Sequence, residues 1–363
     1  MSDLEVPAVG QGSMGIGGRF TADRGRDREA VRLLQLGLDL GLRMIDTAEI
    51  YGAGHAEELV GQAIRGRRHD AIVATKFSPE HSGREEVVWA AERSLRRLDT
   101  DYIDLYQSHW PSMRVPFAET LSGLEALLGS GKVRKVGLSN VRPADVDVAR
   151  AALPPGSVVA VQQPYNLADR LVERDLLPVC QRDGLLLLAY SPLCEGATVP
   201  SDERRSVIEA IGTRRGFSSS QVVLAWLLRH AVVRVIPKAA TEAHLRQNAE
   251  AARFRLDPEE VRAIDQAYAI RLSEIEPDQI EVASTSDRRA YSTVEEALTN
   301  PHGMVPSPAE IAAEILSGTA QRPIKVRRQT GAERPFLLVE GRLRYWAWVI
   351  AHGRHQPISA LLT

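Results

Sequence analysis

The stretch RMIDTAEIYG, residues 43–52, places an acid and a tyrosine at the end of an apolar run. Asp46 closes the run, and Tyr51 follows it five residues later. Reduction of a carbonyl by hydride transfer needs a proton for the developing alkoxide. A phenol can supply that proton if its pKa is brought down from the ordinary value of about 10. The spacing therefore makes Asp46 and Tyr51 candidates for acid–base chemistry.

A lysine and a histidine stand at comparable places, because Lys76 follows the apolar run AIVAT and His109 follows YIDLYQS. A nearby ammonium stabilises phenolate and so lowers the phenol pKa, and a carboxylate beside the lysine keeps it charged. A histidine can polarise the carbonyl oxygen or relay the proton. We therefore expect Tyr51 to be the acid and Lys76 to be its modulator. Asp46 is then the partner of Lys76, and His109 orients the carbonyl.

Eight short apolar runs recur in a regular order along the first part of the chain. Their sequences are AVGQG, RMID, AIVAT, YIDLYQSH, KVGLS, VVAVQQ, LLLLAY and VVRVIP. Their length and their content of Val, Ile and Leu favour strands, and helix-like segments such as REAVRLLQLGLDLG lie between most of them. Strands that alternate with helices predict an α/β fold, here a closed parallel (β/α)8 TIM barrel, with an open doubly wound sheet as the alternative.

In a barrel of this kind the chemistry gathers at the carboxyl ends of the strands. Polar residues follow several of the predicted strands, although a polar residue in that place is also the ordinary pattern for a loop entry. The residues expected at this one mouth are Asp46, Lys76, His109, Ser139, Asn140, Gln162 and Tyr190. Their gathering at one face favours a shared site over separate structural roles.

The composition is that of a soluble protein able to bury a core, since 44% of the 363 residues are apolar and 25% are charged. A net charge of -2 gives no overall electrostatic case for binding nucleic acid or an anionic membrane surface. Cys180 and Cys194 do not form a CxxC pair, so a reducing compartment fits better than a disulfide scaffold or a cysteine-rich zinc site. The apolar stretch QVVLAWLLRHAVVRVI is interrupted by charged residues, so we expect a cytoplasmic protein with no membrane segment.

The candidate residues lie in motifs that resemble those of the aldo-keto reductase family. These motifs are IDTAEIYG, ATK, DLYQSHWP, GLSN, VQQPYN, AYSPL and VIPKAATEAHLRQN, and they keep their order through about residues 5–270. The resemblance implies NAD(P)H-dependent reduction of an aldehyde or ketone, without a metal and without a GxGxxG phosphate loop. A small carbonyl compound is then the expected partner. The motifs predict neither the particular substrate nor the oligomeric state.

The resemblance also implies how the cofactor is held. Ser139, Asn140 and Gln162 match residues that hydrogen-bond the nicotinamide carboxamide, and Tyr190 matches the ring that stacks on the nicotinamide. The glycine-rich segment GQGSMGIGG, which contains Met14, is expected to line the mouth near the cofactor. The whole cofactor-binding set implied in this way is Met14, Ser139, Asn140, Gln162, Tyr190, Ser191, Leu193, Lys238, His244 and Asn248.

The choice of cofactor depends on the segment IPKAATEAHLRQN. By the same resemblance, Lys238 pairs with the 2′-phosphate of the adenosine and Asn248 holds the adenine. Two positions where relatives often carry arginine are Ala240 and His244 here. A lysine gives a point charge where arginine would give a bidentate fork. We still favour NADPH over NADH.

Large apolar side chains lie near the predicted site and in the helices. Trp110 and Met113 come shortly after His109 and are expected in the wall of the substrate pocket. Trp89 and Trp226 lie within helix-like patterns and are expected in the core.

After residue 270 the pattern changes to that of a small α+β domain, so we expect a barrel at 1–270 and a second domain at 271–363. SPAEIAAEILSG predicts a capped helix, RPIKVRR and PFLLVE predict strands, and GRLRYWAWVIAHG predicts a helix that ends at Gly353. The stretch from RPIKVRR to FLLVEGRLRYWA resembles the nucleotide-binding domain of the ParB and sulfiredoxin-like superfamily. This resemblance implies a site for ATP or CTP.

The residues implied for that nucleotide site are Glu340, Gly341, Arg342 and Arg344. A glycine turn at a helix start and guanidinium groups both favour anions, although arginines on the first turns of a helix can equally be solvated. DNA binding is not expected, because the helix-turn-helix that would follow is missing. Sulfiredoxin chemistry is not expected either, because this module contains no cysteine.

The sequence leaves three functions open. The first is an NADPH-dependent aldehyde or ketone reductase whose second domain serves regulation, nucleotide binding or substrate handling. The second is a sensor whose barrel binds reduced cofactor with little turnover, and the third is a bifunctional protein whose second domain is itself catalytic. The presence of all four residues Asp46, Tyr51, Lys76 and His109 favours the reductase.

Overall fold

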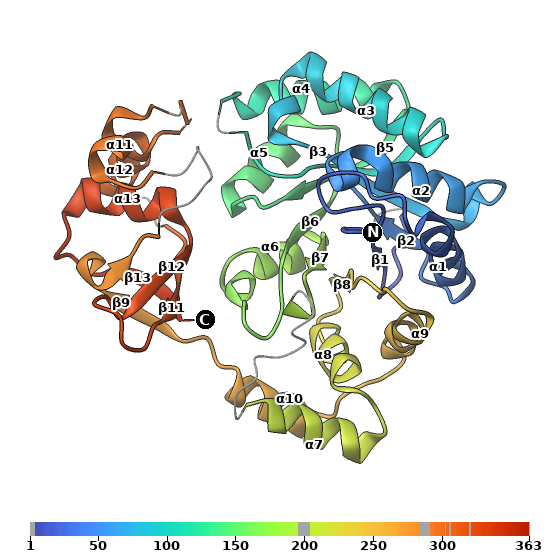
Figure 1. Cartoon of the computed structure of the whole chain (residues 1–363). Helices are drawn as coiled ribbons and strands as arrows, with labels where there is room; N and C mark the ends of the chain where they lie inside the picture. The colour runs from blue at the N-terminus through green and yellow to red at the C-terminus, as the bar shows by residue number, and fades with distance from the viewer. Residues whose placement is uncertain are drawn as a thin grey trace. The chain divides into compact units, whose positions relative to one another are not determined.

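The computed structural model describes residues 4–112, 114–194, 204–283, 291–301, 303–304, 306–318 and 321–362. The chain divides into two compact units, Met1–Tyr268 and Ala269–Thr363 (Figure 1). Within the described residues, no helix is both long enough and apolar enough to cross a membrane.

The first unit is built on a parallel sheet, which has eight strands in the described residues. Val9 forms a parallel bridge with Val235, and the Gly10 amide donates to the Val235 carbonyl at 2.9 Å, so the start of the sheet pairs with its end. The strands pair in chain order, whereas a doubly wound sheet would reverse that order part-way, so the expected TIM-barrel-like architecture is confirmed. The strands are β1 Gln11–Gly12, β2 Met44–Asp46, β3 Ile72–Phe77, β4 Ile103–Ser108, β5 Val133–Ser139, β6 Val158–Pro164, β7 Leu186–Tyr190 and β8 Val233–Val235.

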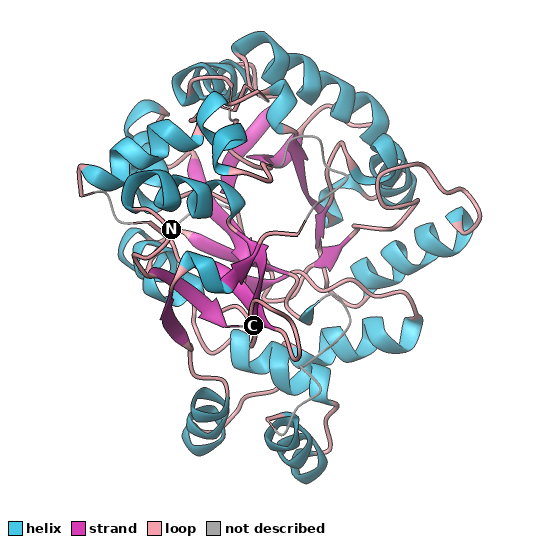
Figure 2. Ribbon diagram, turned by 60° about the vertical axis from the view of Figure 1, so that its left-hand side comes forward, coloured by secondary structure: helices cyan, strands magenta, loops and turns pink. Residues whose placement is uncertain are grey.

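Helices follow the strands and lie outside them (Figure 2). α10 begins at Pro258, after a capping box in which Asp257 accepts from the Glu260 amide and Glu260 accepts from the Asp257 amide. α8 begins in the same way, with Ser218 and Gln221. The helices are α1 Asp27–Asp39, α2 His55–Ile64, α3 Arg84–Leu98, α4 Phe117–Gly129, α5 Pro143–Ala152, α6 Leu176–Asp183, α7 Arg205–Arg215, α8 Ser219–Leu227, α9 Glu242–Ala251 and α10 Pro258–Ala267.

The apolar core of this unit has two parts, because successive side chains of a strand face opposite sides of the sheet. In β2, Met44 belongs to the group inside the barrel, and Ile45 belongs to the layer between strands and helices. Trp226 is fully buried in that outer layer, as expected from the sequence. The group inside the barrel is Val6, Met44, Ile72, Ala74, Leu105, Val159, Ala160, Leu188 and Ile236.

Trp89 lies outside the core, so the expectation from the sequence is wrong for this residue. Its exposed fraction is 44%, whereas Ala90 and Ala91 beside it on α3 are fully buried. The Trp89 ring contacts His81 edge-on, with centroids 4.9 Å apart, and the Arg93 guanidinium lies 4.5 Å from its centroid. Packing against these polar partners keeps the ring on the surface face of the helix.

The second unit is a mixed five-stranded sheet with helices, as counted in its described residues. The strand order is β10-β12-β11-β13-β9, and Tyr345 and Trp346 of α13 pack in its core. α12 begins at a capping box of Ser307 and Glu310, and α13 ends at Gly353, as expected, but β13 was not expected. The elements are β9 Leu272–Ile275, β10 Ile280–Glu281, α11 Val294–Thr299, α12 Pro308–Leu316, β11 Ile324–Arg328, β12 Phe336–Glu340, α13 Arg342–His352 and β13 Ile358–Leu362.

The contact between α2 and α3 depends on Gly61. A Cβ at this position would lie 2.7 Å from the Leu98 carbonyl oxygen and 2.9 Å from that of Arg97, both of them backbone atoms. We expect Gly61→Ala to lower the free energy of unfolding by about 1–3 kcal/mol, because overpacking outweighs the better helix propensity of alanine. Urea unfolding followed by circular dichroism measures the change.

Gly129→Ala at the end of α4 is the matched control. Apart from its chain neighbours and the backbone of its own helix, no described atom lies within 4 Å of a Cβ built at Gly129. Alanine there restricts the unfolded chain without a clash, so we expect an unchanged or higher stability, by up to about 1 kcal/mol. Equal destabilisation by the two substitutions would contradict the packing argument.

Candidate active site

A buried ion pair joins the carboxyl ends of β2 and β3. Lys76 Nζ lies 2.7 Å from Asp46 Oδ2 and donates a second hydrogen bond to the Thr47 carbonyl at 2.8 Å. The exposed fractions of the two residues are 1% and 5%. Burial lowers the pKa of Lys76, but the Asp46 carboxylate and the Tyr51 phenol outweigh it, so the net shift is upward. The ammonium is therefore charged at neutral pH.

Tyr51 begins a short turn, η1 Tyr51–Gly54, which places its ring beside Lys76. Lys76 Nζ lies 5.2 Å from the centre of the Tyr51 ring. The turn needs a left-handed backbone at Gly52 and Ala53, with φ of 56° and 54°, and the Gly52 amide donates to the Arg19 carbonyl at 3.0 Å. The turn and that hydrogen bond fix the backbone position from which the Tyr51 side chain extends.

The pKa of Tyr51 is raised, which differs from the lowering expected from the sequence. Burial raises this pKa more than the neighbouring Lys76 ammonium lowers it, and the Asp46 carboxylate adds to the rise. The lysine still moderates the shift, as the sequence argument proposed. At neutral pH the phenol is protonated, which is the form that a general acid needs.

His109 lies directly after β4 and faces the Tyr51 ring. The two rings meet edge-on with centroids 5.7 Å apart, and the Trp110 ring stacks on the imidazole with centroids 3.9 Å apart. Burial, with a contribution from the Lys76 charge, lowers the pKa of His109 to about 2. The Nδ1 atom is buried without a hydrogen-bond partner among the described residues. The imidazole is therefore neutral over the physiological pH range.

Side chains from β5 and β7 connect to this group by hydrogen bonds. Asn140 Nδ2 donates to the His109 carbonyl at 2.9 Å and to Ser139 Oγ at 3.1 Å, and the Tyr190 hydroxyl donates to Asn140 Oδ1 at 2.8 Å. Asn140 has a φ of 59° and Ser191 a φ of 46°, so both stand in left-handed conformations just beyond their strands. These residues form one side of the mouth.

Gln162 of β6 reaches the ion pair across the barrel. Its Nε2 donates to Asp46 Oδ1 at 3.0 Å, and its Oε1 accepts from Gln107 Nε2 at 3.3 Å. Gln107 was not singled out from the sequence, although a polar residue inside the apolar run YIDLYQS is a detectable signal. It fits because Gly137 on β5 has no side chain, and a Cβ there would lie 2.8 Å from Gln107 Oε1.

The residues expected around the rest of the cofactor lie on the β1 loop, the β7 loop, the loop between β8 and α9, and α9. A Cβ at Gly15 would lie 2.8 Å from Lys238 Nζ, so the lysine head lies over the glycine-rich segment. Burial lowers the pKa of Lys238, and the nearby Arg26 charge adds to this. Met14 packs against the apolar group of Tyr51, and Leu193 packs on the outer core layer.

Two further expected residues belong to α9. The His244 amide donates to the Thr241 hydroxyl at 3.3 Å and so caps the start of this helix. Asn248 lies two turns from that start and is buried. The backbone of His244 thus has a structural role at the start of this helix.

The expected substrate wall is described only in part. Trp110 stacks on His109, and 41% of its surface is exposed, so its ring borders the mouth. Met113 lies outside the described residues.

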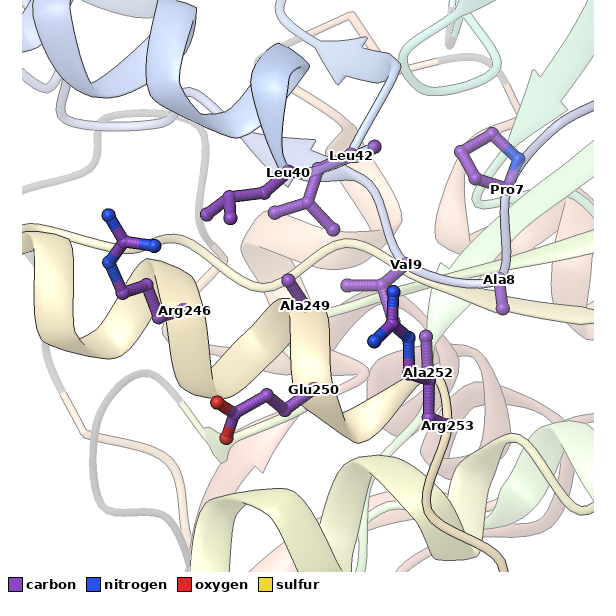
Figure 3. Close-up of a pocket in the computed structure, with 11 residues that line it drawn as sticks. Pro7, Ala8, Val9, Leu40, Leu42, Arg246, Ala249, Glu250, Ala252 and Arg253 are labelled. Carbon is purple, nitrogen blue, oxygen red and sulfur yellow. The ribbon is translucent and has the colours of Figure 1, made fainter.

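Two cavities in the barrel lie away from these residues. One of about 300 Å³ is bordered by Val9 and Leu42, which lie just before β1 and β2, by Arg246 of α9 and by Arg253, two residues after that helix (Figure 3). The other, of about 700 Å³, is bordered by residues at the starts of β6 and β7. Both open at the amino-terminal ends, whereas the reaction sites of TIM barrels lie at the opposite ends.

The residues expected to bind a nucleotide in the second unit have other partners. Arg342 donates to the Tyr291 and Ala283 carbonyls at 3.3 and 2.8 Å, and Arg344 donates to the Arg322 and Pro323 carbonyls at 2.8 and 2.9 Å. Glu340 pairs with Lys325 at 2.5 Å. Gly341 immediately precedes α13 and has a φ of 95°. These side chains hold the unit together, and the geometry gives no support to a phosphate cradle of Arg342 and Arg344.

The first unit is similar to known proteins. The profile described as "Aldo/keto reductase family" matches residues 8–269. The protein "Methylglyoxal reductase YeaE" of Escherichia coli (strain K12) is 40% identical over 268 residues, which are 73% of this chain and 92% of that protein.

Two solved structures are similar to the same part of the chain. A thermostable aldo-keto reductase, solved with the inhibitor epalrestat, is 41% identical with a TM-score of 0.70 and covers 73% of this chain and 96% of its own. An aldo/keto reductase from Klebsiella pneumoniae, solved with NADP and acetate, is 40% identical with a TM-score of 0.68 and covers 72% of this chain and 92% of its own.

The neutral state of His109 predicts how stability responds to acid. The unfolded chain binds a proton at this imidazole below pH 6.5, whereas the folded chain does not until about pH 2, so stability falls as the pH drops through this window. Between pH 6.5 and 5 the loss from this group is about 2 kcal/mol. We expect His109→Gln to remove that part of the slope in urea unfolding.

His55 gives a control of opposite sign. Burial lowers its pKa, but Glu58 at 2.7 Å and Asp27 at 2.9 Å outweigh this and raise it. Its contribution to stability is complete below pH 6.5 and is lost as the pH rises through the folded pKa. His55→Gln should therefore lower stability most below pH 6.5, change the pH dependence of stability only above pH 6.5, and leave the acid slope unchanged. An acid slope that is the same in His109→Gln and in the wild type would contradict the neutral assignment.

Proposed function

The chain belongs to the aldo/keto reductase family, and from this premise we propose that it reduces a small aldehyde or ketone to the alcohol with NADPH. The expectation of an oxidoreductase of this family is confirmed. The observation that carries the proposal is the buried Lys76–Asp46 pair beside a protonated Tyr51 at the carboxyl ends of the strands. This arrangement places one proton donor next to a fixed positive charge.

In the proposed reaction each side chain has one task. NADPH, when bound, supplies the hydride. Tyr51 transfers its phenolic proton to the oxygen of the carbonyl as that oxygen gains negative charge. Lys76 stabilises the phenolate that remains, and Asp46 keeps the ammonium in place. Neutral His109 can donate a hydrogen bond to the same oxygen without supplying a second acidic proton.

The residues at the mouth fit the cofactor that we propose. Ser139, Asn140 and Gln162 bring amide and hydroxyl groups to the carboxyl ends of adjacent strands, next to the Tyr190 ring, where a carboxamide and a flat ring can be held. Lys238 offers its ammonium over a glycine, where a larger residue would clash with it. This ammonium suits a phosphate, so it supports NADPH over NADH.

For the substrate we propose a small carbonyl compound such as methylglyoxal. The 40% identical relative from Escherichia coli, which is named as a methylglyoxal reductase, supports this proposal. The exposed Trp110 ring beside His109 offers an apolar wall, and the imidazole offers a polar group next to it.

Tyr51→Phe is the decisive test of the acid. We expect NADPH consumption with methylglyoxal and a panel of small aldehydes and ketones, and a kcat about 10²–10⁴-fold lower in the variant, because general acid catalysis is lost. Tyr102→Phe is the matched control, since the Tyr102 ring lies between the guanidinium groups of Arg68 and Arg134, away from the mouth, and should behave as wild type. Tight NADPH binding by the wild type without any turnover would instead favour a sensor.

Lys238→Met tests the choice of cofactor. A charge-assisted hydrogen bond contributes about 1.5–3 kcal/mol, so we expect the KM for NADPH to rise about 10- to 100-fold while the KM for NADH changes little. Steady-state kinetics with each cofactor at a fixed carbonyl concentration measures both values. An equal effect on the two cofactors would show that Lys238 does not contact the 2′-phosphate.

A further inference from the structure

A buried carboxylate lies behind the mouth, on the helix that follows Tyr51. Glu57 of α2 is fully buried, and its two oxygens have different partners. Oε1 accepts from the Thr75 hydroxyl at 2.6 Å, and Oε2 accepts from Arg97 Nε at 2.6 Å. One carboxylate thus joins helix α2, strand β3 and helix α3.

The strand partner of Glu57 stands next to the lysine of the ion pair. Thr75 immediately precedes Lys76 on β3, so its side chain faces the helices while that of Lys76 faces the mouth. The hydrogen bond between Thr75 and Glu57 therefore fixes the position of β3 along its axis relative to α2. It thereby fixes the backbone position of Lys76.

The helix partner of Glu57 lies against the turn that carries Tyr51. Gly54 ends this turn with a φ of 97°, and a Cβ there would lie 2.7 Å from Arg97 Cδ and 2.9 Å from Arg97 Nε. The arginine side chain thus packs directly on the main chain of Gly54. It is held there by Glu57 and by a hydrogen bond to Ser94 Oγ at 3.3 Å.

The two charges depend on each other. Burial raises the pKa of Glu57, and the Arg97 charge and the hydrogen bonds oppose that rise. A buried charge that loses its partner is strongly unfavourable, so either residue alone would pull the surrounding backbone out of place. The pair is stable only when α2, α3 and β3 are in the observed register.

We propose that the Glu57–Arg97 pair is a positioning device that sets the distance between the Tyr51 phenol and the Lys76 ammonium. Neither residue contacts the mouth side chains directly, and both act through Gly54 and Thr75. The proposal rests on the proposed function, in which Tyr51 is the proton donor and Lys76 its modulator. A misplacement of a reacting group by about 1 Å can lower a rate about 100-fold.

The test compares three forms of the full chain, Glu57→Gln, Arg97→Met and the double variant, by steady-state reduction of methylglyoxal at saturating NADPH. We expect each single substitution to lower kcat about 10- to 100-fold, while the Kd for NADPH, measured by fluorescence titration, changes less than about 2-fold. The double variant should lose no more than either single variant, because the two residues act as a unit.

Asp104→Asn is the matched control for the loss of a buried ion pair. Asp104 pairs with Arg68 at 2.6 Å and lies at the amino-terminal end of β4, away from the mouth. We expect it to lower the melting temperature, as the Glu57 and Arg97 variants do, but to leave kcat within about 2-fold of the wild type at a temperature where all variants are folded. An equal loss of kcat in Asp104→Asn would show that the Glu57–Arg97 pair contributes only to overall stability, and it would overturn the proposal.

Thr75→Val provides a second variant if the Glu57 and Arg97 variants do not fold. It removes one hydroxyl from the Glu57 contact, keeps the ion pair and should lower kcat by several-fold with an unchanged Kd for NADPH. Wild-type kcat in folded Glu57→Gln and Thr75→Val would overturn the proposal while Tyr51→Phe still abolished turnover. A fully active Tyr51→Phe would instead overturn the proposed function, and the two failures are therefore distinguishable.

Discussion

The buried ion pair between Lys76 and Asp46 is the constraint on which the rest of the mouth depends. Two charges removed from water are stable only if every remaining polar group is satisfied. Lys76 therefore also donates to the Thr47 carbonyl, and Asp46 also accepts from Gln162, which in turn accepts from Gln107. The pair thus fixes side chains from four strands, and these strands can meet at one point only because the sheet curves into a barrel.

The positive charge of Lys76 also influences the protonation states of the side chains beside it. The Lys76 ammonium adds to burial in keeping His109 neutral, and it opposes the effect of burial on Tyr51. At neutral pH the site then contains one ion pair, one neutral imidazole and one protonated phenol. This leaves Tyr51 as the group that can lose a proton to a developing alkoxide with compensation close by, whereas a second acid at His109 would compete with it.

Sequence periodicity predicted the barrel because each strand and helix can be recognised locally, and strand order follows chain order in this fold. The grouping of Asp46, Lys76 and Gln162 followed from that topology. The net pKa of Tyr51 could not be predicted, because burial depends on packing that the sequence does not reveal. Gln107, Glu57 and Arg97 were missed for a related reason, since their partners lie on other elements and depend on register. Trp89 shows that a helical pattern alone does not identify the buried face.

In the second unit a local pattern implied a nucleotide site, and the partners of its arginines give that site no support. A glycine followed by arginines at a helix start has the composition of an anion site, but a guanidinium group satisfies backbone carbonyls equally well. In α13 the arginines bond to carbonyls of other segments and so tie the helix to the loops around it. A half-buried guanidinium group needs partners for all five of its N–H donors. Backbone carbonyls in irregular loops, which lack partners in a helix or sheet, therefore compete with a phosphate for these donors. The partners of an arginine, more than its place in a motif, therefore decide whether it is available to a ligand.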